Sequence, residues 1–181
     1  MLISDRDGVL LDTCKANLDS YTKTAETMGL ATNIQELEIA IHSGAGIVDF
    51  SRRVWGELTT AELNLLRSTK SEYFIENIAN VRVNHDFIES FLVNEKEPYL
   101  VTRASVSSTK FLVDHFGLDF FGKRIISASE SASKIDVFNL ICANLSLDRS
   151  QVTIVDDSPQ IISASTEAGF HTIQYPHFCL S

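Results

Sequence analysis

The stretch that decides the fold is residues 1–13, which read MLISDRDGVLLDT. Its first part, residues 2–4, is a short apolar run that ends abruptly at Asp5. A continuous apolar run of this length predicts a strand that is buried on both faces, as in a parallel sheet. Asp7 and Gly8 follow directly, and a glycine at this point allows the backbone to turn sharply. The stretch therefore predicts a buried first strand with two aspartates where it ends.

The same pattern of a short buried strand recurs along the chain. Strong apolar runs are residues 99–101 and 152–155, and weaker ones are residues 124–126 and 171–173. Helix signals separate these runs: Ser133 with Asp136 predicts one helix start. Ser158 before Pro159 predicts a capped start for another. Strands that alternate with helices predict an α/β fold with a doubly wound parallel sheet, here of about five strands.

The segment 14–81 has a different character, because it shows helix signals and no strand signals. Asn33 precedes an apolar stripe at helical spacing, and Thr59 with Glu62 forms a capping-box pattern. We therefore expect a small helical domain, residues 14–81, inserted into an α/β core domain that comprises residues 1–13 and 82–181.

Composition and charge restrict the cellular setting and the partners. The chain has 181 residues and a formal net charge of −9, so it repels nucleic acid and anionic membrane surfaces. No apolar run is long enough for a membrane helix, and the first residues do not resemble a signal peptide. Its three cysteines form no CxxC pair, which argues against a disulfide framework and against a zinc site. We expect a cytoplasmic protein that is a monomer or a homodimer.

Polar residues stand where the expected buried strands end or where a helix begins. These residues are Asp5, Asp7, Thr102, Lys134, Asp156 and Asp157. In an open α/β sheet, ligands bind in the crevice at the carboxyl ends of the strands, so the topology should gather these side chains there. A lysine at a helix N-terminus opposes the helix dipole, which favours an anion in front of Lys134.

The chemistry of this set points to phosphoryl transfer. Several carboxylates that lie close together repel one another unless a hard cation lies among them, and Mg²⁺ prefers oxygen ligands. A carboxylate such as Asp5 can attack phosphorus and form an acyl phosphate. The reaction also needs an acid that protonates the leaving oxygen, and Asp7 is close enough in sequence to point into the same crevice. The bound metal, Thr102 and Lys134 could neutralise charge on the phosphoryl oxygens.

Residues 5–13, DRDGVLLDT, resemble the first signature of the haloacid dehalogenase-like (HAD) hydrolase superfamily, DxDG[TV]LxD[ST]. The other signatures follow in order. Thr102 closes an apolar strand, Lys134 opens a helix, and the pair Asp156 and Asp157 closes a later strand. The chain departs from the usual pattern at Arg6, where the superfamily often has an apolar or small residue.

This resemblance implies a role for each matching residue. Asp5 would be the nucleophile and a Mg²⁺ ligand, and Asp7 would be the general acid/base with its backbone carbonyl on the metal. Thr102 and Lys134 would hold the transferring phosphoryl group. Asp157 would complete the metal site with Asp156 beside it, and we favour Asp157 as the direct ligand.

The resemblance also implies a role for the inserted helices. Residues 14–81 match a C1-type helical cap, and the loop that contains His42, Ser43 and Gly44 falls where such caps place a specificity loop. Arg103 follows Thr102 and would lie on the phosphate side of the crevice. A short cap leaves a modest space, so we expect a small-molecule phosphate ester as substrate.

The function expected from the sequence is a Mg²⁺-dependent phosphatase that hydrolyses a phosphate monoester through an aspartyl-phosphate intermediate. A sugar-phosphate mutase similar to β-phosphoglucomutase needs the same two aspartates, so the core residues leave this alternative open. A dehalogenase needs no second aspartate to protonate its leaving group, and Asp7 therefore argues against it. A non-catalytic binding module is disfavoured because every expected catalytic position is present.

Overall fold

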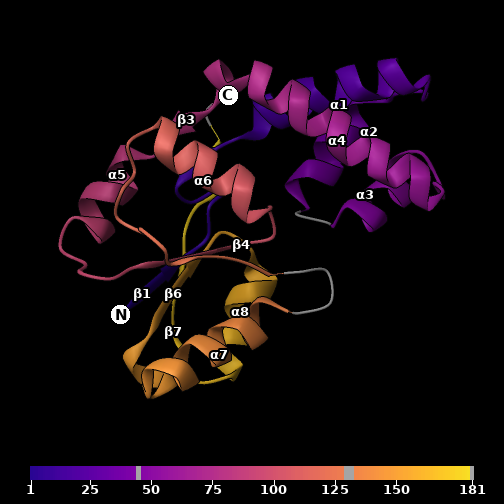
Figure 1. The fold of residues 1–181 in the computed structure, drawn as a ribbon. Coiled ribbons are helices and arrows are strands. Elements are labelled where there is room, and N and C mark those ends of the chain that lie inside the picture. Colours follow the sequence, from indigo (N-terminus) through magenta and orange to yellow (C-terminus); the bar gives the residue numbers. More distant parts are fainter. Residues whose placement is uncertain (44–45, 129–132, 180–181) are drawn as a thin grey trace. The chain divides into compact units, whose positions relative to one another are not determined.

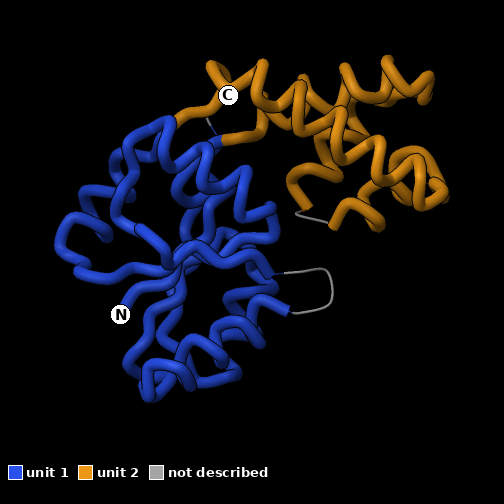
Figure 2. Tube along the Cα trace, in the orientation of Figure 1, with its two compact units in different colours: residues 1–12, 83–181 blue, residues 13–82 orange. Residues whose placement is uncertain are grey.

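The chain divides into two compact units in the computed structural model, which describes residues 1–43, 46–128 and 133–179. Unit 1 comprises residues 1–12 and 83–181, and unit 2 comprises residues 13–82 (Figure 2). Each boundary lies one residue from the one expected for the core and the inserted helical domain. That unit 2 acts as a cap stays a prediction.

A five-stranded sheet forms the centre of unit 1 (Figure 1). Its strands are β1 (Leu2–Ser4), β4 (Tyr99–Thr102), β5 (Ile125–Ser127), β6 (Thr153–Asp156) and β7 (His171–Gln174). They are all parallel and lie in the order β5-β4-β1-β6-β7, so the first strand of the chain occupies the central position. The sequence prediction of a doubly wound parallel sheet with about five strands is confirmed.

The strand order has a reversal at β1. After β1 the chain adds β4 and then β5 on one side, and it later adds β6 and β7 on the other side. Within the sheet, Ser4 is in register with Leu100 of β4 and with Val155 of β6. The residues that follow β1, β4 and β6 therefore emerge at the same edge of the sheet, where ligands bind in open α/β folds.

Helices cover both faces of this sheet (Figure 1). One face carries α5 (His85–Phe87), which continues into the π-helical turn η2 (Ile88–Leu92), and α6 (Val106–His115). The other face carries α7 (Lys134–Leu145) and α8 (Pro159–Glu167), and the short 3₁₀ helix η3 (Arg149–Gln151) precedes β6. Buried residues of β1, β4, β6 and α7 form one apolar cluster that includes Ile3, Val101, Phe138 and Ile154. This packing holds the strand ends in place.

Asn84 ties the loop after β1 to the segment that leads into α5. The residue is 2% exposed, its Nδ2 donates to the carbonyl of Val9 at 2.7 Å, and its Oδ1 accepts from the backbone N–H of Phe87 at 3.1 Å. Next to it, β2 (Leu11–Asp12) and β3 (Arg82–Val83) form a two-stranded sheet that the sequence did not predict. These bonds hold together the two crossings of the chain between unit 1 and unit 2.

Unit 2 is helical, as expected. Its helices are α1 (Cys14–Met28), α2 (Ile34–His42), α3 (Ile47–Val54) and α4 (Thr60–Glu76), followed by the 3₁₀ helix η1 (Ile78–Asn80). The predicted caps are present, because the Asn33 side chain accepts backbone N–H groups at the start of α2 and Thr59 forms a full capping box with Glu62. Within the described residues, no helix has the length and apolar character needed to span a membrane.

One predicted cap is wrong in its mechanism. Ser158 occupies the N-cap position of α8 and Pro159 begins the helix, but the Ser158 side chain makes no capping hydrogen bond. Its hydroxyl instead donates to Gln160 Oε1 at 3.0 Å, and its backbone N–H donates to Asp156 Oδ1 at 2.9 Å. The start of α8 thus supports the carboxylate at the end of β6.

Candidate active site

Asp5 stands at the carboxyl end of the central strand, where hydrogen bonds extend the sheet by one residue. Its backbone N–H donates to the carbonyl of Val155 at 2.9 Å, and the N–H of Arg6 donates to Asp5 Oδ1 at 2.7 Å. The chain then turns, because the N–H groups of Leu10 and Leu11 both donate to the carbonyl of Arg6 at 3.0 and 2.8 Å. The Asp5 side chain is thereby fixed at the mouth of the sheet and is 12% exposed.

Gly8 makes this turn possible for two reasons. Its φ of +76° lies in the left-handed region, which costs a residue with a side chain more than it costs glycine. In addition, a Cβ atom at this position would collide with the side chains of Asp157 and His177. The glycine of the first signature is therefore a requirement of close packing as well as of backbone conformation.

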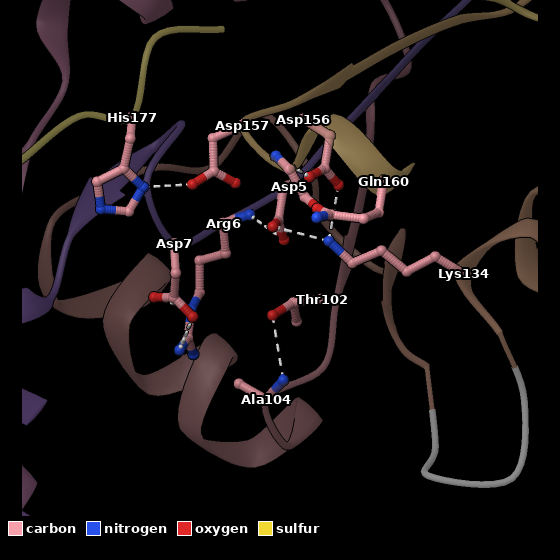
Figure 3. A network of polar contacts seen from close by, with 11 residues as sticks. Asp5, Arg6, Asp7, Thr102, Ala104, Lys134, Asp156, Asp157, Gln160 and His177 are labelled. Atoms are coloured by element: carbon pink, nitrogen blue, oxygen red, sulfur yellow. Dashed lines mark hydrogen bonds and ion pairs between the residues drawn. The ribbon is translucent and has the colours of Figure 1, made fainter. Parts of the chain in front are cut away.

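The ammonium group of Lys134 links Asp5 to the neighbouring strand (Figure 3). Lys134 Nζ lies 2.7 Å from Asp5 Oδ2 and 2.8 Å from Asp156 Oδ2, and the lysine side chain is only 5% exposed. Lys134 is the first residue of α7, whose start is set by a capping box between Ser133 and Asp136. The sequence predicts an anion in front of Lys134, and the structure shows two carboxylates of the protein there, those of Asp5 and Asp156.

Burial and neighbouring charges together shift the pKa values of Asp5 and Lys134. Burial raises the pKa of Asp5 to about 7, and the carboxylates of Asp156 and Asp7 act in the same direction while Lys134 opposes it. Burial by itself would lower the pKa of Lys134, but the two carboxylates outweigh it, so the pKa is raised and the lysine stays charged. Asp5 is thus a carboxylate whose ionised form depends on neighbouring positive charge.

Three carboxylates at this edge could hold a metal ion. Asp5, Asp156 and Asp157 each offer one oxygen, and these oxygens all lie within 4.8 Å of one another. Asp156 is 1% exposed and already accepts from Ser158 N–H and from Lys134, whereas Asp157 is only partly buried. Oxygen ligands at such spacing suit a hard divalent cation.

Asp7 lies outside that cluster, and its carboxylate is directed toward the guanidinium group of Arg6 (Figure 3). Arg6 Nε donates to Asp7 Oδ1 at 3.0 Å and Arg6 Nη2 donates to Asp7 Oδ2 at 2.7 Å. The Asp7 side chain keeps 39% of its surface exposed. The two aspartates of the first signature are therefore held by different cations.

Thr102 ends β4, the strand next to β1, and is 1% exposed. Its Oγ1 accepts from the backbone N–H of Ala104 at 3.1 Å, which orders the loop that leads into α6. Figure 3 shows Thr102 in the same group of residues as Asp5 and Lys134. Arg103, the next residue, is exposed.

The expected specificity residues belong to unit 2. His42 Nδ1 lies 2.7 Å from the carbonyl of Glu38, and the hydroxyl of Ser43 donates to the carbonyl of Ala40 at 2.7 Å. Both side chains thus bind to their own helix, α2. Gly44, the third residue of the expected loop, lies outside the described residues.

His177 is a residue of this site that the sequence reasoning missed. Its Nδ1 contacts Asp157 Oδ2, and this contact raises the pKa of the imidazole (Figure 3). The segment that carries it is attached by backbone bonds from Tyr175 N–H to the Asp156 carbonyl and from Phe178 N–H to the Gly8 carbonyl, at 3.0 and 2.8 Å. A lone histidine after the last strand belongs to no spacing pattern, so the sequence could not predict this contact with Asp157.

The contacts of Lys134 lead to a prediction about stability. Replacing Lys134 with Met leaves Asp5 and Asp156 at the same place without their cation, so the free energy of unfolding should fall by about 3–5 kcal/mol. Urea denaturation followed by circular dichroism measures this loss. The matched control is Lys110→Met, at an exposed lysine, which should change stability by less than about 0.5 kcal/mol. Equal stability of the two variants would contradict the prediction.

Comparisons with known proteins agree with this fold. The family model of haloacid dehalogenase-like hydrolases matches residues 2–175. A predicted phosphoglycolate phosphatase from Haemophilus somnus superimposes with a TM-score of 0.79 at 20% identity, covering 98% of this chain and 85% of the other. CbbY from Rhodobacter sphaeroides gives 0.77 at 19% identity, covering 98% and 86%.

A haloacid dehalogenase-like hydrolase from Streptococcus pneumoniae gives a TM-score of 0.75 at 18% identity, covering 94% of this chain and 81% of the other. No curated protein matches the sequence. At these identities the solved structures show a common fold, whereas the family model spans nearly all of the sequence. The chain therefore belongs to the haloacid dehalogenase-like hydrolases.

Proposed function

We propose that this hydrolase is a Mg²⁺-dependent phosphatase that acts on a small-molecule phosphate monoester through an aspartyl-phosphate intermediate. The observation that carries the proposal is the surrounding of Asp5. Its carboxylate lies at the end of the central strand, 2.7 Å from the Lys134 ammonium group and in one cluster with Asp156 and Asp157. An anionic nucleophile among groups that can bind a metal is what attack on a phosphate ester requires.

In the first step, an Asp5 carboxylate oxygen attacks the phosphorus atom and the bond from phosphorus to the leaving oxygen breaks. Asp7, two residues further along the chain, donates a proton to that oxygen as the alcohol departs. Lys134 is positioned to offset the negative charge of the phosphoryl oxygens next to Asp5, and Thr102 offers its hydroxyl from the neighbouring strand.

In the second step, water attacks the phosphorus atom of the aspartyl phosphate and the bond to the Asp5 oxygen breaks. Asp7 accepts the proton of the attacking water, so inorganic phosphate leaves and both carboxylates return to their starting state. The 39% exposure of the Asp7 side chain supports this role, because the group that activates water must be reachable by water.

The charges of the site support a divalent cation. When the three clustered carboxylates are ionised, Lys134 compensates one of them and leaves two negative charges. Mg²⁺ matches this charge and prefers the oxygen ligands that Asp5, Asp156 and Asp157 offer. When bound, the ion neutralises charge on the phosphoryl oxygens, and we propose Asp157 as a direct ligand because Asp156 is already bonded to Lys134 and Ser158.

The solved structures of similar fold support a small phosphorylated substrate. One structure of CbbY contains phosphate, and a mutant of the same protein was solved in complex with xylulose-(1,5)bisphosphate. A third similar structure is a predicted phosphoglycolate phosphatase. We therefore propose a phosphorylated metabolite as the substrate, and a panel of such metabolites assayed for phosphate release with and without Mg²⁺ would identify it.

Replacing the nucleophile should abolish turnover. In Asp5→Asn, the amide cannot form the acyl phosphate, so phosphate release should fall by about three orders of magnitude or more. The assay measures inorganic phosphate from a substrate found in the panel. Asp119→Asn, at an exposed aspartate of unit 1, is the matched control and should keep its activity. Full activity of Asp5→Asn would rule out the mechanism.

His177 should support the metal site through Asp157. In His177→Ala the Asp157 carboxylate loses this partner, and the affinity for Mg²⁺ should fall by about 10- to 100-fold. Isothermal titration calorimetry with Mg²⁺ measures the affinity without any substrate. His171→Ala, at an exposed histidine of β7, should bind Mg²⁺ like the unaltered protein. If both variants bind equally well, His177 has no role at the metal site.

The products distinguish hydrolysis from the mutase alternative. Hydrolysis should release one inorganic phosphate for each substrate molecule consumed, because water attacks the aspartyl phosphate in the second step. A mutase would return the phosphoryl group to another hydroxyl of the sugar. Phosphorus NMR of the reaction mixture should show inorganic phosphate and no isomerised sugar phosphate; an isomer with little free phosphate would identify a mutase.

A further inference from the structure

Arg6, between the two aspartates of the first signature, is a buried charged residue whose contacts the proposed steps do not use. Its side chain is 5% exposed. The guanidinium group holds both oxygens of Asp7, through Nε at 3.0 Å and Nη2 at 2.7 Å. Its remaining nitrogen, Nη1, donates to Thr109 Oγ1 at 3.0 Å. The fork of Arg6 therefore connects Asp7 to helix α6.

Thr109 gives this connection a rigid base. Thr109 is fully buried, and its hydroxyl donates to the carbonyl of Ser105 at 3.0 Å. The hydroxyl proton is thus used, and the oxygen faces Arg6 as an acceptor. Ser105 is the N-cap of α6 and its side chain accepts from the N–H of Ser108 at 3.2 Å. The first turn of α6 consequently fixes where the guanidinium group lies.

The geometry determines the orientation of Asp7 as well as its location. In an extended strand, neighbouring side chains point to opposite faces, but the turn after Asp5 brings Arg6 and Asp7 together. Two parallel hydrogen bonds from a planar guanidinium group set the rotation of a carboxylate, which a lysine ammonium group cannot do. The Asp7 side chain keeps 39% of its surface exposed, so a substrate or water molecule can reach the carboxylate that Arg6 orients.

We infer that Arg6 is a positioning residue which, anchored by Thr109, holds the Asp7 carboxylate in the orientation that proton transfer requires. The inference rests on the proposed function, in which Asp7 exchanges a proton with the leaving oxygen and with water. A displacement of about 1 Å in a reacting group can cost 10²-fold in rate, so an arginine that prevents rotation of Asp7 affects the rate without touching the substrate.

The first test compares two leaving groups. An alkyl phosphate needs a proton on its leaving oxygen, whereas p-nitrophenolate leaves without one. In Arg6→Met, kcat/KM for the alkyl phosphate should fall at least about tenfold more than kcat/KM for p-nitrophenyl phosphate. Arg149→Met replaces an exposed arginine of unit 1 and should leave both values unchanged. An equal loss for both substrates in Arg6→Met would mean a structural role and would overturn the inference.

The second test asks whether Arg6 acts through Asp7. In an Asp7→Asn background the proton donor is already absent, so adding Arg6→Met should change kcat/KM for the alkyl phosphate by less than about threefold. The same change in the unaltered protein should be much larger. Full additivity of the two substitutions would overturn the inference, because it would mean that Arg6 contributes independently of Asp7.

Two milder variants keep the test decisive if Arg6→Met does not fold. Thr109→Val removes the anchor and keeps the ion pair, and Arg6→Lys keeps the charge and removes the fork. Both should shift the ratio of the two kcat/KM values in the direction of Asp7→Asn, and an unchanged ratio in both would overturn the inference.

A structural readout separates this inference from the proposed function. If the unaltered protein releases no phosphate from any substrate, the proposed function fails, and crystal structures of the unaltered protein and of Thr109→Val still report the Asp7 side chain. A changed or disordered Asp7 in the variant supports positioning by Arg6 and Thr109. An identical Asp7 orientation in both structures overturns it.

Discussion

The buried ammonium group of Lys134 is the constraint on which the arrangement of this site depends. It lies between carboxylates from two neighbouring strands, Asp5 after β1 and Asp156 at the end of β6. Without a cation these two groups would repel each other at the point where the strands must stay paired. The lysine opens α7, where the helix dipole disfavours a positive charge, so its position is tolerated because of the anions in front of it. A single positive charge thereby joins α7 to the ends of β1 and β6.

A second cation, Arg6, binds the second aspartate of the first signature. Asp5 is bonded to Lys134 and lies in the carboxylate cluster, whereas Asp7 is bonded to Arg6 outside it. The carboxylates of Asp156 and Asp7 both raise the pKa of Asp5, and the Lys134 ammonium group opposes them. Lys134 from α7 and Arg6 from the loop itself thus give the two aspartates different surroundings, as the proposed roles of nucleophile and proton carrier require.

Much of the fold could be predicted because its signals are local. Short apolar runs located the five strands of the sheet, and capping patterns such as Ser133 with Asp136 located helix starts. The meeting of Asp5, Lys134 and Asp156 followed from the rule that ligand sites form at the carboxyl ends of parallel strands.

The rest of the site depends on contacts between distant segments that have no sequence pattern. His177 reaches Asp157 because the chain after the last strand passes the Gly8 turn, where the Phe178 N–H donates to the Gly8 carbonyl. No pattern in the sequence predicts this contact. The bond from Arg6 to Thr109 joins residues 103 positions apart. Arg6 stood out in the sequence as a departure from the usual pattern, but its partner could be named only from the structure.

The hydrogen bonds around Asn84 and the pairing of β2 with β3 have a consequence for how such a protein can diversify. They hold the two ends of the inserted segment close together. Since loop-closure entropy grows only with the logarithm of length, doubling such an insertion costs about 0.6 kcal/mol. The inserted helices can therefore be lengthened, shortened or replaced at a small cost in loop-closure entropy, while Asp5 and Lys134 keep their places in unit 1.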